Sequence, residues 1–80
     1  MQVIVLGRQD RNVQHIEQAA RSALAAAGME AAVTTSADPD VVAAHRPART
    51  PALVVDGRVV LEGCVPSAEE VRDLLGLGSA

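Results

Sequence analysis

A proline-initiated apolar run followed by Asp-Gly constrains the fold more than any other part of this sequence. Residues 51–55 are Pro-Ala-Leu-Val-Val, and Asp56-Gly57 separates them from a second β-branched run that begins after Arg58. Asp-Gly between two such runs predicts a β-hairpin, because both central residues of a type I′ turn need a positive φ. Proline cannot donate a hydrogen bond to a sheet, so Pro51 must begin its strand or lie at an edge.

The first third of the chain predicts a strand followed by a long helix. A short apolar run at 2–6 indicates a buried strand that ends at Gly7, and a polar loop follows at 8–12. Asp10 is a suitable N-cap for the helix, and Gly28 is placed where a left-handed C-terminal cap belongs. The apolar residues that recur at helical spacing are Val13, Ile16, Ala20 and Leu24.

The rest of the chain adds a strand, a short helix and a last helix to the hairpin. Alternation of apolar and polar residues predicts a half-exposed strand over 29–34. Asp38-Pro39 begins a short helix that should end near His45, with proline at the first helical position. Ser67 and Glu70 form a capping-box pattern for a helix that should end near Leu75.

This order of elements predicts one α/β domain over residues 1–80. The elements are βαβ followed by αββα, so we expect a four-stranded mixed sheet flanked by helices on its two faces. The first two strands, joined by a long helix, should be parallel with a right-handed crossover. The closing hairpin must be antiparallel.

Composition limits both the core and the chemistry. The 80 residues are 49% apolar with no aromatic residue, so the core is thin. A homodimer would stabilise such a chain by burying further apolar surface. A single cysteine excludes an internal disulfide and a Cys-x-x-Cys dithiol. A net charge of −3 argues against a nucleic-acid partner.

No apolar stretch approaches the ~20 residues that span a bilayer, and strand-like residues begin at Gln2. We therefore expect no membrane association and a cytoplasmic protein.

Three segments resemble the small thioredoxin-like family often called redox-active disulfide proteins. In that family a strand ends in Leu-Gly before a Cys-x-x-Cys loop and a long helix, and Thr-Pro-Ala-Leu-Val-Val-Asp-Gly comes later. Leu6-Gly7 and Thr50 through Gly57 match these motifs, and Gly63-x-Val65-Pro66-Ser67 matches a later loop. The resemblance covers about Val3 to Leu75. It implies a thioredoxin-like fold and a cis bond between Thr50 and Pro51, facing the start of the long helix.

The sequence departs from this family at its redox centre. Alignment on Gly7 and Ile16-Glu17 puts Asp10 and Val13 where the family has its two cysteines. Neither residue can form a thiolate or close a disulfide, so dithiol oxidoreductase activity is excluded. A shift of the alignment by one or two residues changes nothing, because this region contains no cysteine. Asp10 offers the helix N-terminus a carboxylate instead, and Val13 can join the apolar face.

The remaining candidate residues lie, by the resemblance, along the edge that faces the cis-proline. Cys64 is either an inert loop residue or a monothiol that forms mixed disulfides, for example with glutathione. Arg8 and Arg11 precede the long helix, and Arg46 and Arg49 precede Pro51. These arginines either keep the edge soluble and balance Asp10, or help to hold a carboxylate or phosphate.

No metal site or cofactor is predicted. His15 and His45 can be combined with Cys64 and Asp10 on paper, but these residues lack the spacing of metal ligands. Two functions therefore remain. The first is a redox-inactive module whose Thr50-Pro51 edge binds an extended peptide, a protein or a small anion, with a self-associating accessory subunit as its variant. The alternative is a monothiol exchange protein that uses Cys64.

Overall fold

The computed structural model describes residues 1–77, which form four strands and three helices. None of the helices in this part of the chain is long and apolar enough to cross a membrane. In chain order, the elements are β1 (Gln2–Leu6), α1 (Arg11–Ala26), β2 (Ala32–Ser36), α2 (Pro39–His45), β3 (Ala52–Val55), β4 (Arg58–Glu62) and α3 (Ala68–Leu74).

The strands form one mixed sheet in the order β2-β1-β3-β4. β1 pairs in parallel with β2 and antiparallel with β3, which in turn pairs antiparallel with β4. The predicted α/β architecture, with a four-stranded mixed sheet and a closing antiparallel hairpin, is confirmed. The domain bounds at 1 and 80 stay a prediction, and residues 78–80 lie outside the described part.

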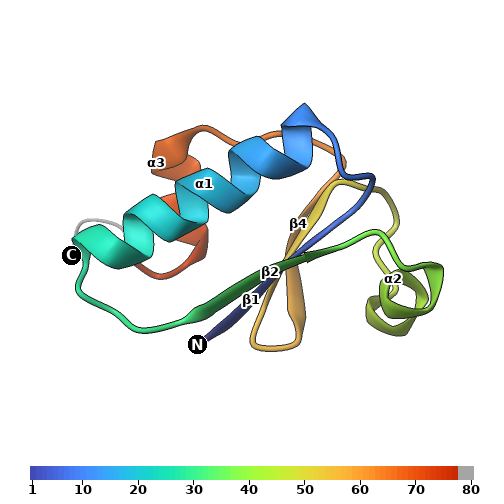
Figure 1. Ribbon diagram of the computed structural model, residues 1–80, viewed down its shortest axis with the longest axis horizontal. Coiled ribbons are helices and arrows are strands. Elements are labelled where there is room, and N and C mark those ends of the chain that lie inside the picture. Colours follow the sequence, from blue (N-terminus) through green and yellow to red (C-terminus); the bar gives the residue numbers. More distant parts are fainter. Residues whose placement is uncertain (78–80) are drawn as a thin grey trace.

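The sheet is covered on both faces, as Figure 1 shows, with α1 and α3 together on one side and α2 on the other. Alternate residues of β1 supply the two layers: Val3 and Val5 pack under α1 and α3, whereas Leu6 faces α2. Because β1 and β3 are central and buried on both sides, their sequences are continuous apolar runs rather than alternating ones. All four predicted core residues of α1 are buried, together with Ala23.

Local capping explains where the helices begin and end. Asp10 is the N-cap of α1, and Ser67 forms the predicted capping box with Glu70 at α3. Gly28 has a φ of +67°, and the N–H of the next residue, Met29, donates to the carbonyl of Leu24 at 3.0 Å. This is the six-to-one bond of a Schellman motif, so the prediction of a left-handed end at Gly28 is confirmed.

The hairpin turn has the predicted geometry and also binds a neighbouring strand. Asp56 and Gly57 have φ values of +50° and +84°, as a type I′ turn requires. The backbone N–H of Gln2 donates to Oδ1 of Asp56 at 2.8 Å, and the N–H of Asp56 donates to the carbonyl of Gln2. The turn residue therefore fixes the start of β1 against the end of β3.

The prediction of a strand over 29–34 is wrong in its position. β2 spans Ala32–Ser36, because Gly28 and Met29 are used to end α1 and Met29 is 40% exposed. Pairing starts where β1 starts: Gln2 lies opposite Ala32, and the pairs continue to the end of β1. Half of the predicted strand, residues 29–31, therefore lies in the connecting segment, and the other half, residues 32–34, lies in β2.

Candidate functional site

A hollow of about 300 Å³ lies between the start of α1 and the loop that precedes β3. The resemblance predicted that these two segments face each other, and they line the hollow from opposite sides. Its lining residues are Arg8, Asp10, Asn12, Val13, Thr50 and Pro51. Five of these six were predicted as site residues. Asn12 was not, although its position between Asp10 and Val13 would have indicated it.

Gly7 determines how closely the two sides approach. It has a φ of +143°, which residues with a side chain rarely adopt, and it is buried. A β-carbon added there would lie 3.3 Å from Cγ2 of Val13 and 3.4 Å from Cα of Pro51 and Cβ of Thr50. The backbone of Gly7 therefore fills the space between α1 and the proline loop, which explains why Leu6-Gly7 belongs to the motif.

On the α1 side, the Asp10 side chain accepts hydrogen bonds from backbone N–H groups at the start of the helix. Its Oδ1 accepts hydrogen bonds from the backbone N–H groups of Asn12 at 3.0 Å and Val13 at 3.1 Å. These N–H groups are the donors that would stabilise a thiolate or an external anion at a helix start. Because an internal carboxylate already holds them, an external anion gains little from this terminus.

Val13, which the resemblance aligns with the second family cysteine, has no polar side-chain group. It is 1% exposed and belongs to the main core under α1. Its Cγ2 methyl group lies against Gly7, and Val13 lines the hollow. The α1 side therefore contributes packing and a cap, and it offers no nucleophile.

On the opposite side, the backbone of Thr50 is unused. The peptide bond between Thr50 and Pro51 is cis, and Thr50 is exposed. Within residues 1–77, no hydrogen bond uses the N–H or the carbonyl of Thr50, because the pairing of β3 with β1 ends at Ala52. The N–H donor and the carbonyl acceptor of Thr50 therefore have no hydrogen-bond partner among residues 1–77.

Cys64 lies next to this loop, in the segment between β4 and α3. The N–H of the preceding residue, Gly63, donates to the carbonyl of Pro51 at 2.9 Å, and Cys64 is exposed and unpaired. A β-carbon on Gly63 would lie 3.0 Å from Cδ of Arg49, so the Arg49 side chain covers this glycine. Gly63, next to Cys64 in the chain, therefore contacts both Arg49 and the proline loop.

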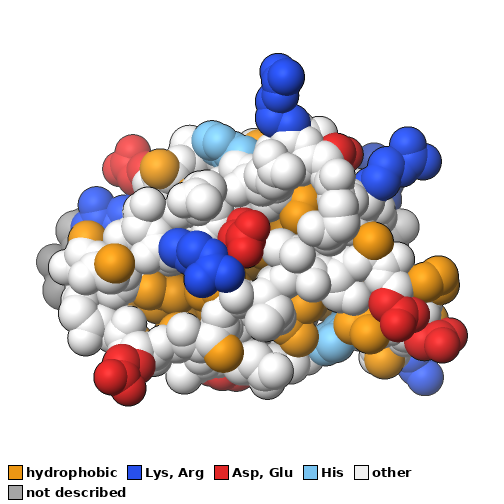
Figure 2. Space-filling model, viewed as in Figure 1, with side chains coloured by type: hydrophobic (Ala, Val, Ile, Leu, Met, Phe, Trp, Pro, Cys, Tyr) orange, Lys and Arg blue, Asp and Glu red, His pale blue; other side chains and the backbone are white. Residues whose placement is uncertain are grey.

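The four arginines of the predicted binding edge have different surroundings. All four are exposed, but Arg8 lines the hollow and Arg49 lies on Gly63, whereas Arg11 and Arg46 do not line this hollow. In that part of the chain the one ion pair within 4.0 Å joins Arg21 to Glu17, so Asp10 is not paired with any of these arginines. On the face shown in Figure 2, basic and acidic side chains are scattered and form no continuous basic area.

A second hollow of about 420 Å³ lies on the other side of Arg8 and Thr50, towards α2. The sequence does not indicate this hollow, because its apolar residues belong to the short helix α2 and the segment before it. They are Ala37, Pro39 and Val42, and Gly7 completes the lining with Arg8 and Thr50. Thr50 therefore stands between a polar hollow and a more apolar one.

The residues considered for a metal site do not form one. His45 lies at the end of α2, where its Nδ1 is 3.0 Å from the carbonyl of Val41, and His15 is exposed on α1. Among residues 1–77, no group of three or more His, Cys, Asp or Glu side chains is arranged to hold a metal ion.

Comparison with protein families decides the relationship that the motifs suggested. Residues 1–76 match the family model described as the thioredoxin domain. The chain belongs to the thioredoxin-domain family. Neither the curated proteins nor the solved structures gave a significant match. Within this thioredoxin domain, Cys64 is the single cysteine, so the fold is retained without a Cys-x-x-Cys motif.

Proposed function

We propose that this thioredoxin domain is a redox-inactive binding or accessory module that uses the edge around Thr50 and Pro51. The observation that carries the proposal is the state of α1 at the two former cysteine positions. Asp10 holds the helix N–H groups and Val13 is buried, so the start of α1 has no group that can attack a disulfide. The recognition side of the hollow keeps its free backbone groups.

The proposed ligand is an extended segment of a protein or peptide. Its backbone would pair with the N–H and carbonyl of Thr50, in the manner of a strand added to a sheet edge. An acidic side chain or terminal carboxylate of the ligand would meet Arg8, which has no carboxylate partner within residues 1–77. Glutathione, a short anionic peptide, belongs to the same ligand class, and neither ligand requires a cofactor.

A second candidate function rests on the exposure of Cys64 beside the proline loop. In this monothiol reaction, the Cys64 thiolate attacks one sulfur of oxidised glutathione. A bond forms between Cys64 and that sulfur, the glutathione disulfide bond breaks, and the second glutathione leaves as a thiolate. Attack of another thiolate on the glutathione sulfur of this mixed disulfide would complete the cycle, because a new disulfide forms with that glutathione and Cys64 leaves as a thiolate.

Titration of ¹⁵N-labelled protein tests the binding module. The probes are reduced glutathione and a short extended peptide with acidic residues. We expect chemical-shift changes confined to 8–12, 46–51 and 63–66, with weaker binding in Arg8→Ala and unchanged binding in Arg58→Ala, an exposed arginine on β4. Shifts that fall only on other surfaces, for every probe, would refute the binding edge.

Mass spectrometry after incubation with oxidised glutathione tests the second candidate. A glutathione adduct that forms faster on the native protein than on the urea-unfolded chain supports monothiol exchange. Labelling of the native protein that is slower than that of a free-cysteine peptide rules the reaction out. Sedimentation of the same samples tests the variant in which the domain self-associates, and a monomer at millimolar concentration would argue against it.

A further inference from the structure

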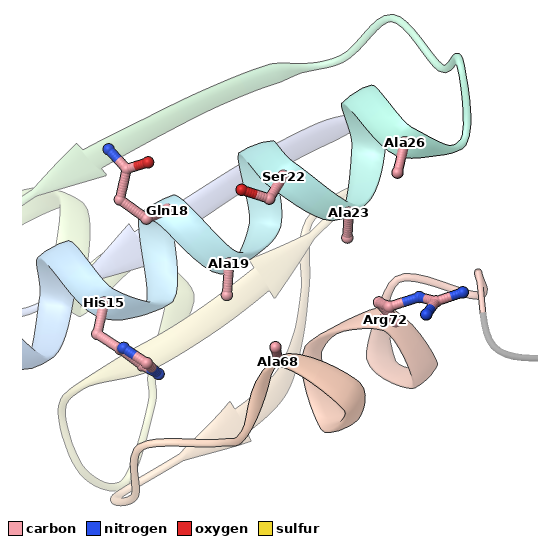
Figure 3. A pocket seen from close by; sticks show the side chains of 8 residues that line it. All are labelled: His15, Gln18, Ala19, Ser22, Ala23, Ala26, Ala68 and Arg72. Atoms are coloured by element: carbon pink, nitrogen blue, oxygen red, sulfur yellow. The ribbon is translucent and has the colours of Figure 1, made fainter.

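A groove of about 400 Å³ runs between α1 and α3 and shares no lining residue with the hollow at Thr50 (Figure 3). Figure 3 shows Ala19, Ala23 and Ala26 on the side of α1 that faces α3, with Ala68 across from them. The other lining residues are His15, Gln18, Ser22 and Arg72. The groove is therefore mostly apolar and open to the solvent.

The groove exists because its residues are small. Ala19, Ala23 and Ala26 follow the i, i+4, i+7 spacing of one helix face, and their methyl groups leave room between the two helices. From His15 to Ala26 the groove extends along α1 for about 16 Å, at 1.5 Å per residue, which is three helical turns. A helix of three turns would therefore fit along the groove, and the small side chains of α1 would let it approach closely.

The charges of the lining select the chemistry of the occupant. Arg72 is the charged residue of the lining, His15 adds an imidazole at the opposite end, and the lining includes no Asp or Glu. Among residues 1–77, Arg72 has no carboxylate within 4.0 Å, although Glu69 and Asp73 are on the same helix. A ligand with carboxylates beside an apolar stripe would complement this surface.

We infer that the groove docks an acidic amphipathic helix from a partner protein, with its apolar stripe on the alanine floor and a carboxylate at Arg72. This binding mode places residues of the partner at i, i+4 and i+7 into the spaces between the alanines. The site is separate from the Thr50 edge, so the domain would hold two different partners or two segments of one partner.

A second copy of this chain does not supply such a helix. α2 and α3 have seven residues each, which is about two turns and too short for the groove. α1 is long enough, but Glu17 is its one acidic residue and is already paired with Arg21 at 2.9 Å. The first residue of α1, Arg11, is basic. No helix among the described residues therefore presents a free acidic face of three turns.

The experiment uses two designed helical peptides that differ only in charge. Both carry leucine at i, i+4 and i+7, and one has glutamate beside this stripe where the other has lysine. We expect the glutamate peptide to shift the amide resonances of 15–26 and 68–72 and to bind at least about fivefold more tightly than the lysine peptide. The resonances at 46–51 should not move, which separates this result from the test of the Thr50 edge.

Two variants examine the groove further. Arg72→Glu, on an exposed position of α3, should reverse the preference so that the lysine peptide binds more tightly, whereas the matched Arg58→Glu should leave the preference unchanged. Ala26→Leu fills the open end of the groove from an exposed position and should weaken both peptides. Equal affinities of the two peptides for the unmodified protein, an unchanged preference in Arg72→Glu, self-association in place of peptide binding, or no shift at millimolar peptide would each overturn the inference.

Discussion

The two sides of the hollow at Thr50 have opposite relations to the rest of the fold. On the α1 side the two residues aligned with the family cysteines are used internally: Asp10 caps the helix and Val13 is part of the core. On the other side, Thr50 is exposed and its backbone groups bind nothing within residues 1–77. In this thioredoxin domain the start of α1 is therefore occupied by structural residues, whereas the backbone of Thr50 has no partner within residues 1–77.

The difference follows from what each half needs. A nucleophile at a helix start depends on N–H donors that have no internal partner, and Asp10 removes that condition with a single side chain. The proline loop depends on backbone geometry, which Gly7 supports from below by close contact with Pro51 and Thr50. A reactive helix start depends on the side chains at two positions, so substitution there removes it. The geometry of the proline loop depends instead on packing against Gly7.

The largest expected effect is a gain of disulfide-reducing activity, which would make the α1 side of the hollow reactive. Asp10→Cys combined with Val13→Cys rebuilds Cys-x-x-Cys at the start of α1 and returns the helix N–H groups to a thiolate. We expect this double variant to reduce insulin disulfides in the presence of dithiothreitol above the rate of dithiothreitol alone, whereas the unmodified protein does not.

The matched control is Asp10→Ser with Val13→Cys, which has one thiol at this site and keeps a capping side chain. If the double-cysteine variant folds, shown by an unchanged circular dichroism spectrum, and remains inactive, the start of α1 is not the former redox centre.

Gly7→Ala should cause the largest loss of stability among the single substitutions. The new methyl group meets Val13 and the proline loop at 3.3–3.4 Å, and the φ of +143° disfavours any side chain. We expect the free energy of unfolding to fall by about 3 kcal/mol in urea titrations.

The control is Gly28→Ala, which has a positive φ but open space around it and should cost about 1 kcal/mol. Equal losses at the two glycines would mean that contact between the two sides contributes nothing beyond backbone strain.

Asp10→Ala tests how much the cap of α1 contributes to stability. Loss of the two hydrogen bonds to Asn12 and Val13 should lower the free energy of unfolding by about 1 kcal/mol. Because the helix N–H groups are then free, we expect added phosphate to restore part of the melting temperature of this variant more than it raises that of the unmodified protein.

Asp38→Ala, at the cap of the shorter α2, removes one hydrogen bond and should show a smaller loss without this phosphate response. The same response in both variants would indicate general ion effects rather than a vacated site.

Thr50→Ala should have the smallest effect on stability. Its side chain is exposed and forms no hydrogen bond within the described residues, so we expect a change within about 0.5 kcal/mol. A loss well above this value in urea titrations would show that Thr50 is structural, and the contrast between the two sides would then be weaker than the geometry indicates.

The sequence predicted best those features that a few neighbouring residues decide. The hairpin at Asp56-Gly57 and the capping box of Ser67 are closed by residues within four positions of one another, so their patterns were sufficient. The position of β2 was missed because its pairing depends on where β1 begins, which is distant in sequence. The hollow beside Val42 and the groove beside Ala68 were missed for the same reason: each exists only between separate elements.

By itself, the sequence determined that this thioredoxin domain has no dithiol, because one cysteine cannot close an internal disulfide under any alignment. It also determined the hairpin and the helix ends. Only the tertiary structure decided that Arg8, rather than Arg11 or Arg46, lines the hollow, and that Gly7 joins its two sides. Composition and local patterns specify which groups exist and how the chain turns, whereas the packing of the helices on the sheet determines which groups meet.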